Sequence, residues 1–89
     1  MPLDAPAPLE LHPDVALRPE PFGALAYHYG TRRLTFLRSP DLVRLVEDLA
    51  RHPSVDDALA ASPIEERRWP AFRTAVASLA ESGFLRARD

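Results

Sequence analysis

The sequence has 89 residues, a formal net charge of −2 at pH 7 and no cysteine. A chain of this length forms one small domain. The absence of cysteine excludes disulfides, cysteine-ligated zinc, iron–sulfur clusters and thiol catalysis, and it is typical of a cytoplasmic protein. The negative net charge argues against general nucleic-acid binding. No apolar run reaches the roughly 18 residues that a membrane span requires.

The N-terminal segment, residues 1–13, is rich in proline and alanine. It has neither the basic start nor the apolar core of a signal peptide. We therefore expect residues 1–13 to form a flexible lead-in and residues 14–89 to form the folded domain.

Three short strands are predicted next. Residues 15–17 lie between Pro13 and Pro19, which favours a short edge strand. A hairpin is expected over residues 22–37, where Gly30-Thr31 predicts a two-residue type II′ turn with a positive φ at the glycine. Folding about this turn pairs Tyr29 with Arg32, Tyr27 with Leu34, and Leu25 with Phe36. Together these strands predict a three-stranded antiparallel sheet.

The hairpin divides its side chains between the two faces of that sheet, because successive residues of a strand point in opposite directions. We expect the face with the larger apolar side chains to hold the domain together: Leu25, Tyr27, Leu34 and Phe36. The other face is expected to point outward: Ala24, Ala26, His28, Arg33, Thr35 and Leu37. The chain then turns away into a helix, so the strand Arg33–Leu37 is expected to keep one open edge.

Capping residues predict the starts of the first two helices. Ser39 is expected to cap a helix that starts at Pro40 and stops at His52. Ser54 and Asp57 imitate a capping box and predict a short second helix that ends before Pro63.

The third helix is expected over Trp69–Ser82, after a helical turn at residues 63–68, with Pro70 in its first turn. Gly83 is typical of the residue that ends a helix, and Phe84 and Leu85 are expected to fold back onto the core. The resulting order, three strands and then three helices, predicts an α+β fold with a three-stranded antiparallel sheet packed on three helices.

The sequence contains no recognisable catalytic or metal-binding pattern. His12, His28 and His52 are scattered along the chain without metal-ligand spacing, and three glycines do not make a phosphate-binding loop. The helix-capping role of Ser39 and Ser54 explains both residues without catalysis. We therefore expect a binding module that is not an enzyme, with no catalytic residue, no metal and no cofactor.

Two features of this domain could carry binding. A peptide could add as a new strand to the open edge of Arg33–Leu37, and Thr35→Pro is expected to remove an edge N–H and that binding while keeping the fold. The third helix could wall a groove beside this edge, with Arg73 exposed and Ala77 beside the buried stripe. Several arginines could then attract an acidic peptide: Arg32, Arg33, Arg38, Arg68 and Arg73. The alternative is that these arginines are solvated and merely keep the edge from aggregating.

Four segments of the sequence carry a resemblance to a known family: GALAYHYGTRRLTFL, SPDLVRLVEDLA, HPSVDDAL and ESGFLR. Over residues 11–86 the chain resembles the PqqD-like family of RiPP recognition elements, and within it the branch that serves mycofactocin biosynthesis. The resemblance implies a winged-helix-like domain that binds the leader of a ribosomally made precursor peptide and delivers it to a radical SAM maturase. The iron–sulfur clusters and S-adenosylmethionine would belong to that enzyme. By position in the matching elements, the implied peptide-binding residues are Arg33, Leu34, Thr35, Phe36, Leu37, Phe72, Arg73, Val76 and Ala77.

Three other interpretations remain at this point. A winged-helix DNA-binding protein is the first, although such proteins usually begin with a helix and present a basic recognition helix. The second is a recognition element of another RiPP pathway. The third is a small oligomerisation domain in which the strand Arg33–Leu37 pairs with itself.

Overall fold

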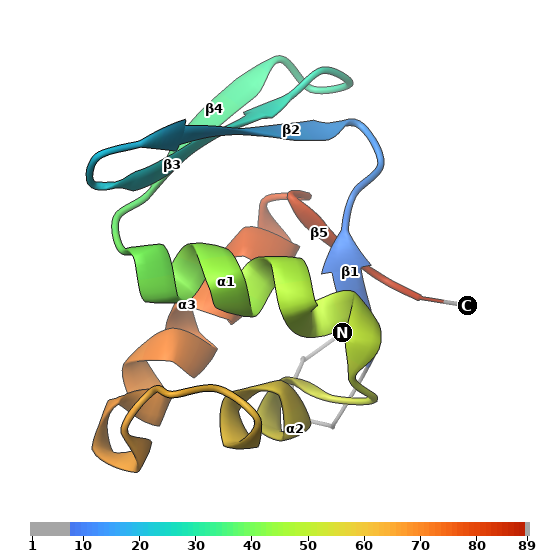
Figure 1. The fold of residues 1–89 in the computed structure, drawn as a ribbon. Coiled ribbons are helices and arrows are strands. Elements are labelled where there is room, and N and C mark those ends of the chain that lie inside the picture. Colours follow the sequence, from blue (N-terminus) through green and yellow to red (C-terminus); the bar gives the residue numbers. More distant parts are fainter. Residues whose placement is uncertain (1–7, 89) are drawn as a thin grey trace.

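The fold, in a computed structural model that describes residues 8–88, combines strands at both ends of the chain with three helices (Figure 1). The elements in order are β1 (Leu9–Leu11), β2 (Val15–Glu20), β3 (Gly23–His28), β4 (Arg33–Leu37), α1 (Pro40–Asp48), α2 (Val55–Ala60), α3 (Trp69–Glu81) and β5 (Leu85–Ala87). Two short 3₁₀ turns cover Leu49–Arg51 and Glu66–Arg68. The predicted α+β class is confirmed: β2, β3 and β4 form a three-stranded antiparallel sheet beside three helices.

The hairpin register is confirmed, whereas its turn is longer than predicted. Leu25 pairs with Phe36 and Tyr27 with Leu34, as expected, and the last ladder pair joins His28 to Arg33. Four residues, 29–32, therefore form the loop, and the Arg32 N–H donates to the carbonyl oxygen of His28 at 2.7 Å. The positive φ lies at Arg32 (60°), not at Gly30. The prediction of a type II′ turn at Gly30-Thr31 was therefore wrong.

The two faces of the sheet are the reverse of the prediction. Ala24, Ala26 and Leu37 are almost fully buried, and α1 packs against β3 on this side. Leu34 and Phe36 are 51% and 49% exposed on the opposite, outer face. The small alanine side chains let the helix approach the sheet closely, so the face with the smaller residues is the one that is covered.

A second, two-stranded sheet was not predicted. β1 pairs antiparallel with β5, and Leu9 at its start is 4% exposed. Residues 9–13 therefore belong to the folded unit rather than to a lead-in, and residues 1–7 of that predicted segment lie outside the described residues. In Figure 1 this small sheet lies beside α1, below one end of the larger sheet.

The helix starts follow the capping pattern of the sequence. Ser39 Oγ accepts from the Leu42 N–H and Ser54 Oγ accepts from the Asp57 N–H, both at 3.0 Å. Pro70 lies in the first turn of α3, and Gly83 follows its end with a φ of 87°. The predicted helical turn at residues 63–68 is shorter, since only Glu66–Arg68 is helical.

The core lies between the larger sheet and the helices. Its largest fully buried side chains come from β4, α1, the first 3₁₀ turn, α2 and α3: Leu37, Leu45, Val46, Leu49, Leu59 and Val76. Within residues 8–88, no helix has the length and apolar character needed to cross a membrane.

Candidate functional site

The candidate site is the outer edge of β4. The strand order is β2-β3-β4, so β4 has one strand neighbour among the described residues and one open side. Ser39 and Pro40 turn the chain into α1 directly after β4, and no further strand within residues 8–88 pairs with that side. An open edge presents backbone N–H and C=O groups that another strand can pair with.

The direction of the backbone groups along β4 can be read from Gly23. A Cβ atom placed on Gly23 would lie 2.1 Å from the carbonyl oxygen of Leu37, so this oxygen points at β3. The backbone groups of one strand residue point to one side, and the direction alternates from residue to residue. Thr35 and Arg33 therefore share the direction of Leu37, whereas the backbone groups of Leu34 and Phe36 face the open edge.

An apolar surface adjoins this edge on the outer face of the sheet. Its large exposed side chains are Phe22, Tyr29, Leu34 and Phe36. Two aromatic contacts lie on this surface: Phe22 packs edge-on against Phe36 with ring centroids 5.7 Å apart, and Tyr29 packs against Tyr27 with ring centroids 4.8 Å apart. A hollow of about 460 Å³ lies at the end of β4 and is lined by Phe22, Phe36 and Arg38. Phe22 was not among the predicted site residues, because the face that is open to solvent was expected to be the buried one.

The predicted peptide-binding residues separate into a strand group and a helix group. On β4, Arg33, Leu34 and Phe36 are exposed, Thr35 is half-buried and Leu37 is buried. On α3, Phe72 and Val76 belong to the core, Ala77 is half-buried and Arg73 is exposed. β4 packs mainly on β3 and α1, and α3 packs mainly on β5 and the turn that precedes it. The open part of the predicted groove is thus the strand.

The arginines also separate into two groups. Arg68 pairs with Asp41 at 3.2 Å, and Arg73 pairs with Asp56 at 2.7 Å. The arginines that flank or begin β4 have no ion pair with any residue of the range 8–88: Arg32, Arg33 and Arg38. Of these five arginines, the ones whose charge is free for a ligand therefore lie along β4 and not on α3.

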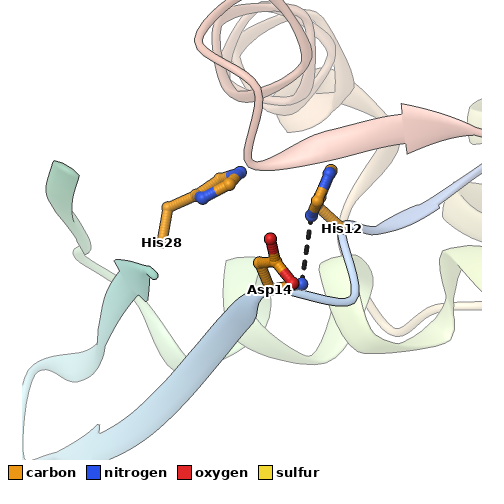
Figure 2. A group of neighbouring side chains, drawn as sticks. All are labelled: His12, Asp14 and His28. Atoms are coloured by element: carbon orange, nitrogen blue, oxygen red, sulfur yellow. Dashed lines mark hydrogen bonds between the residues drawn. The ribbon is translucent and has the colours of Figure 1, made fainter. Parts of the chain in front are cut away.

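A second cluster of polar residues lies at the other end of the hairpin. His12, Asp14 and His28 converge so that one ligand-type atom of each lies within 4.8 Å of the others (Figure 2). The sequence spacing of the histidines gave no sign that two of them, His12 and His28, lie side by side in the fold. His28, which was expected on the outer face, is 4% exposed, and His12 belongs to the connection between β1 and β2.

The hydrogen bonds of the cluster give both histidine rings a structural role. The Asp14 N–H donates to His12 Nδ1 at 3.0 Å, and the Gly30 and Thr31 N–H groups donate to His28 Nδ1 at 3.1 and 3.2 Å. A nitrogen that accepts in this way has a lone pair, so each neutral ring carries its proton on Nε2. A metal ion at Nε2 would force that proton onto Nδ1 and break these bonds.

Comparisons with known proteins identify the family of this chain. The model of the peptide chaperone MftB family matches residues 8–86. The peptide chaperone MftB of Mycolicibacterium smegmatis is 44% identical over 75 residues, which cover 84% of this chain and 74% of that protein. The Mycobacterium tuberculosis protein of the same name is 41% identical over 75 residues, 84% of this chain and 69% of that protein. No solved structure matches the chain. The chain belongs to the peptide chaperone MftB family, a branch of the PqqD-like RiPP recognition elements.

Proposed function

We propose that this chain is a peptide chaperone of mycofactocin biosynthesis that binds the leader of the precursor peptide as a fourth strand on β4. The observation that carries the proposal is the open edge at which the backbone groups of Leu34 and Phe36 point away from β3. Strand addition gains main-chain hydrogen bonds from such groups whatever the peptide sequence. The names of the relatives, peptide chaperone MftB, support a peptide ligand and a role without catalysis.

The charge around β4 favours an acidic peptide. Arg32 and Arg33 stand at the start of the strand and Arg38 stands just beyond its end. Opposite charges across an interface raise the association rate and select among partners. The free arginines therefore favour an acidic leader at this edge. A nucleic acid at α3 is disfavoured, because the exposed Arg73 of that helix is paired with Asp56.

Delivery to an enzyme completes the proposed role. The chaperone holds the leader in the cytoplasm and presents the rest of the precursor to a radical SAM maturase. An edge-bound leader leaves the helical side of the domain uncovered for that enzyme. Of the helix residues implied by the family resemblance, Arg73 and Ala77 are the ones whose side chains reach the surface.

A pair of substitutions at one position tests strand addition. Leu34→Pro removes an N–H that faces the open edge, and Leu34→Ala removes the same side chain but keeps the N–H. Isothermal titration calorimetry with the synthetic mycofactocin precursor peptide should show at least tenfold weaker binding for Leu34→Pro than for Leu34→Ala. Circular dichroism should show the same fold for both. Equal affinities of the two variants would overturn the strand-addition proposal.

A further inference from the structure

The outer face of the sheet offers a place for the side chains of the added strand, and this inference rests on the proposed function. Successive side chains of a strand point to opposite faces, so every second residue of the peptide would lie on the outer face beside Leu34 and Phe36. Both side chains are about half exposed there. The peptide would therefore meet an apolar surface at alternate positions and not merely a row of backbone groups.

The hollow next to Phe36 has an apolar lining that suits a side chain of the bound peptide. Its volume is about 460 Å³, and the phenyl rings of Phe22 and Phe36, inclined at 64° to each other, form its apolar lining. Phe22 is 41% exposed although it contributes to this wall. Exposed aromatic side chains that line a concave surface are the usual anchors of a binding partner.

Arg38 adds a charge at the hollow. Its guanidinium carbon lies 5.6 Å from the centroid of the Phe36 ring, within the range of a cation–π contact. It has no carboxylate partner within residues 8–88. The ring holds the guanidinium beside the hollow, where its N–H groups can donate to a carboxylate of the ligand.

We propose that the hollow lined by Phe22, Phe36 and Arg38 is a specificity subsite for the bound peptide. It takes one large apolar side chain from an outward-pointing position of the added strand. An acidic residue near that position pairs with Arg38. The leader is thus recognised through its backbone at the β4 edge and through this side-chain pair on the outer face.

The test measures binding of the synthetic mycofactocin precursor peptide to Phe22→Ala and Arg38→Gln by calorimetry. Both residues lie outside β4, so their loss leaves the edge hydrogen bonds in place. Arg44→Gln is the matched control, since it removes an exposed arginine of α1 that has no ion pair within residues 8–88. We expect about tenfold weaker binding for Phe22→Ala, a severalfold loss for Arg38→Gln and less than a twofold change for Arg44→Gln.

An alanine scan of the peptide then identifies the partner residues. One apolar peptide position should lose its effect when Phe22 is already alanine, and one acidic position should lose its effect in Arg38→Gln. If Phe22→Ala and Arg38→Gln both bind the peptide as the unchanged protein does, while Leu34→Pro does not bind it, the subsite is overturned. Strand addition is then still supported. Binding that survives Leu34→Pro overturns the proposed function itself.

If Phe22→Ala fails to fold, Phe22→Leu and Arg38→Gln decide the question. A weaker self-association of Phe22→Ala in sedimentation, with peptide binding intact, would assign the hollow to a second copy of the chain and overturn the subsite.

Discussion

His28 lies against His12 with the two ring centroids 4.6 Å apart, although 15 residues separate them in the sequence (Figure 2). One ring comes from the end of β3 and the other from the connection between the two sheets. The edge of His28 also meets Phe84, which follows α3, with centroids 5.8 Å apart. His28 therefore joins the hairpin, the N-terminal strand segment and the end of the last helix.

The first prediction concerns this buried ring. His28→Ala removes the acceptor of the Gly30 and Thr31 N–H groups and leaves a cavity next to Phe84. We expect a loss of about 2 kcal/mol in the free energy of unfolding, measured by urea denaturation. His52→Ala is the control, because the His52 ring is half-buried and makes no hydrogen bond within residues 8–88. That control should change stability by less than about 0.5 kcal/mol.

The second prediction concerns zinc at the same cluster. A ligand that binds only the folded state raises the unfolding temperature. Because backbone N–H groups occupy Nδ1 of both rings, zinc should not raise the melting temperature at low micromolar concentration. Asp14→Asn serves as the matched variant and should melt at the same temperature with and without zinc. A zinc-dependent rise that disappears in Asp14→Asn would refute the structural role of the cluster.

The third prediction separates two neighbouring positions of β4. Thr35→Pro should unfold the domain or destabilise it by about 3 kcal/mol, because the Thr35 N–H faces β3 and belongs to the ladder. Leu34→Pro should remain folded, because its N–H faces the open edge. Circular dichroism and thermal melting compare the two. A stable Thr35→Pro beside an unfolded Leu34→Pro would reverse the assigned backbone direction.

The length of the hairpin loop explains why the Thr35 N–H was wrongly expected to face the open edge. A two-residue turn makes Tyr29 and Arg32 the closing hydrogen-bonded pair, and that directs the Thr35 N–H outward. The four-residue loop makes His28 and Arg33 the closing pair. The pairing of residues is unchanged, but the hydrogen-bonded and non-hydrogen-bonded pairs exchange places. Turn length depends on Arg32 adopting a positive φ, for which the sequence carries no signal.

The wrong prediction of which sheet face is buried has a different physical origin. Alternation with a period of two shows which side chains share a face, and it does not show which face is covered. The larger apolar residues suggested one answer, whereas α1 packs over Ala24 and Ala26. In contrast, the helix starts were predictable from Ser39 and Ser54 because a cap is a local interaction within a few residues. The β1–β5 pairing joins residues 9–11 to 85–87, beyond the reach of local patterns.

The fourth prediction concerns the close approach of β3 and β4. Gly23→Ala should cost about 3 kcal/mol of stability, since Gly23 has a φ of 148° and a Cβ there would meet the Leu37 carbonyl oxygen. Gly83→Ala is the matched control: its φ is also positive, at 87°, but nothing lies within 4 Å of its Cβ position. The control should cost about 1 kcal/mol. Chemical denaturation of both variants measures the difference, and equal losses would show that backbone strain alone matters at Gly23.

The fifth prediction concerns the unpaired arginines at the start of β4. Arg33→Gln should weaken binding of the precursor peptide severalfold, mainly through a slower association rate, and should reduce the dependence of affinity on salt. Arg67→Gln, on the turn that precedes α3, removes the same charge from a position away from the strand. It should change affinity by less than twofold. Stopped-flow association at two salt concentrations distinguishes the variants. Equal losses in both would mean that an arginine contributes alike wherever it lies on the domain, and would contradict a specific role of the arginines along β4.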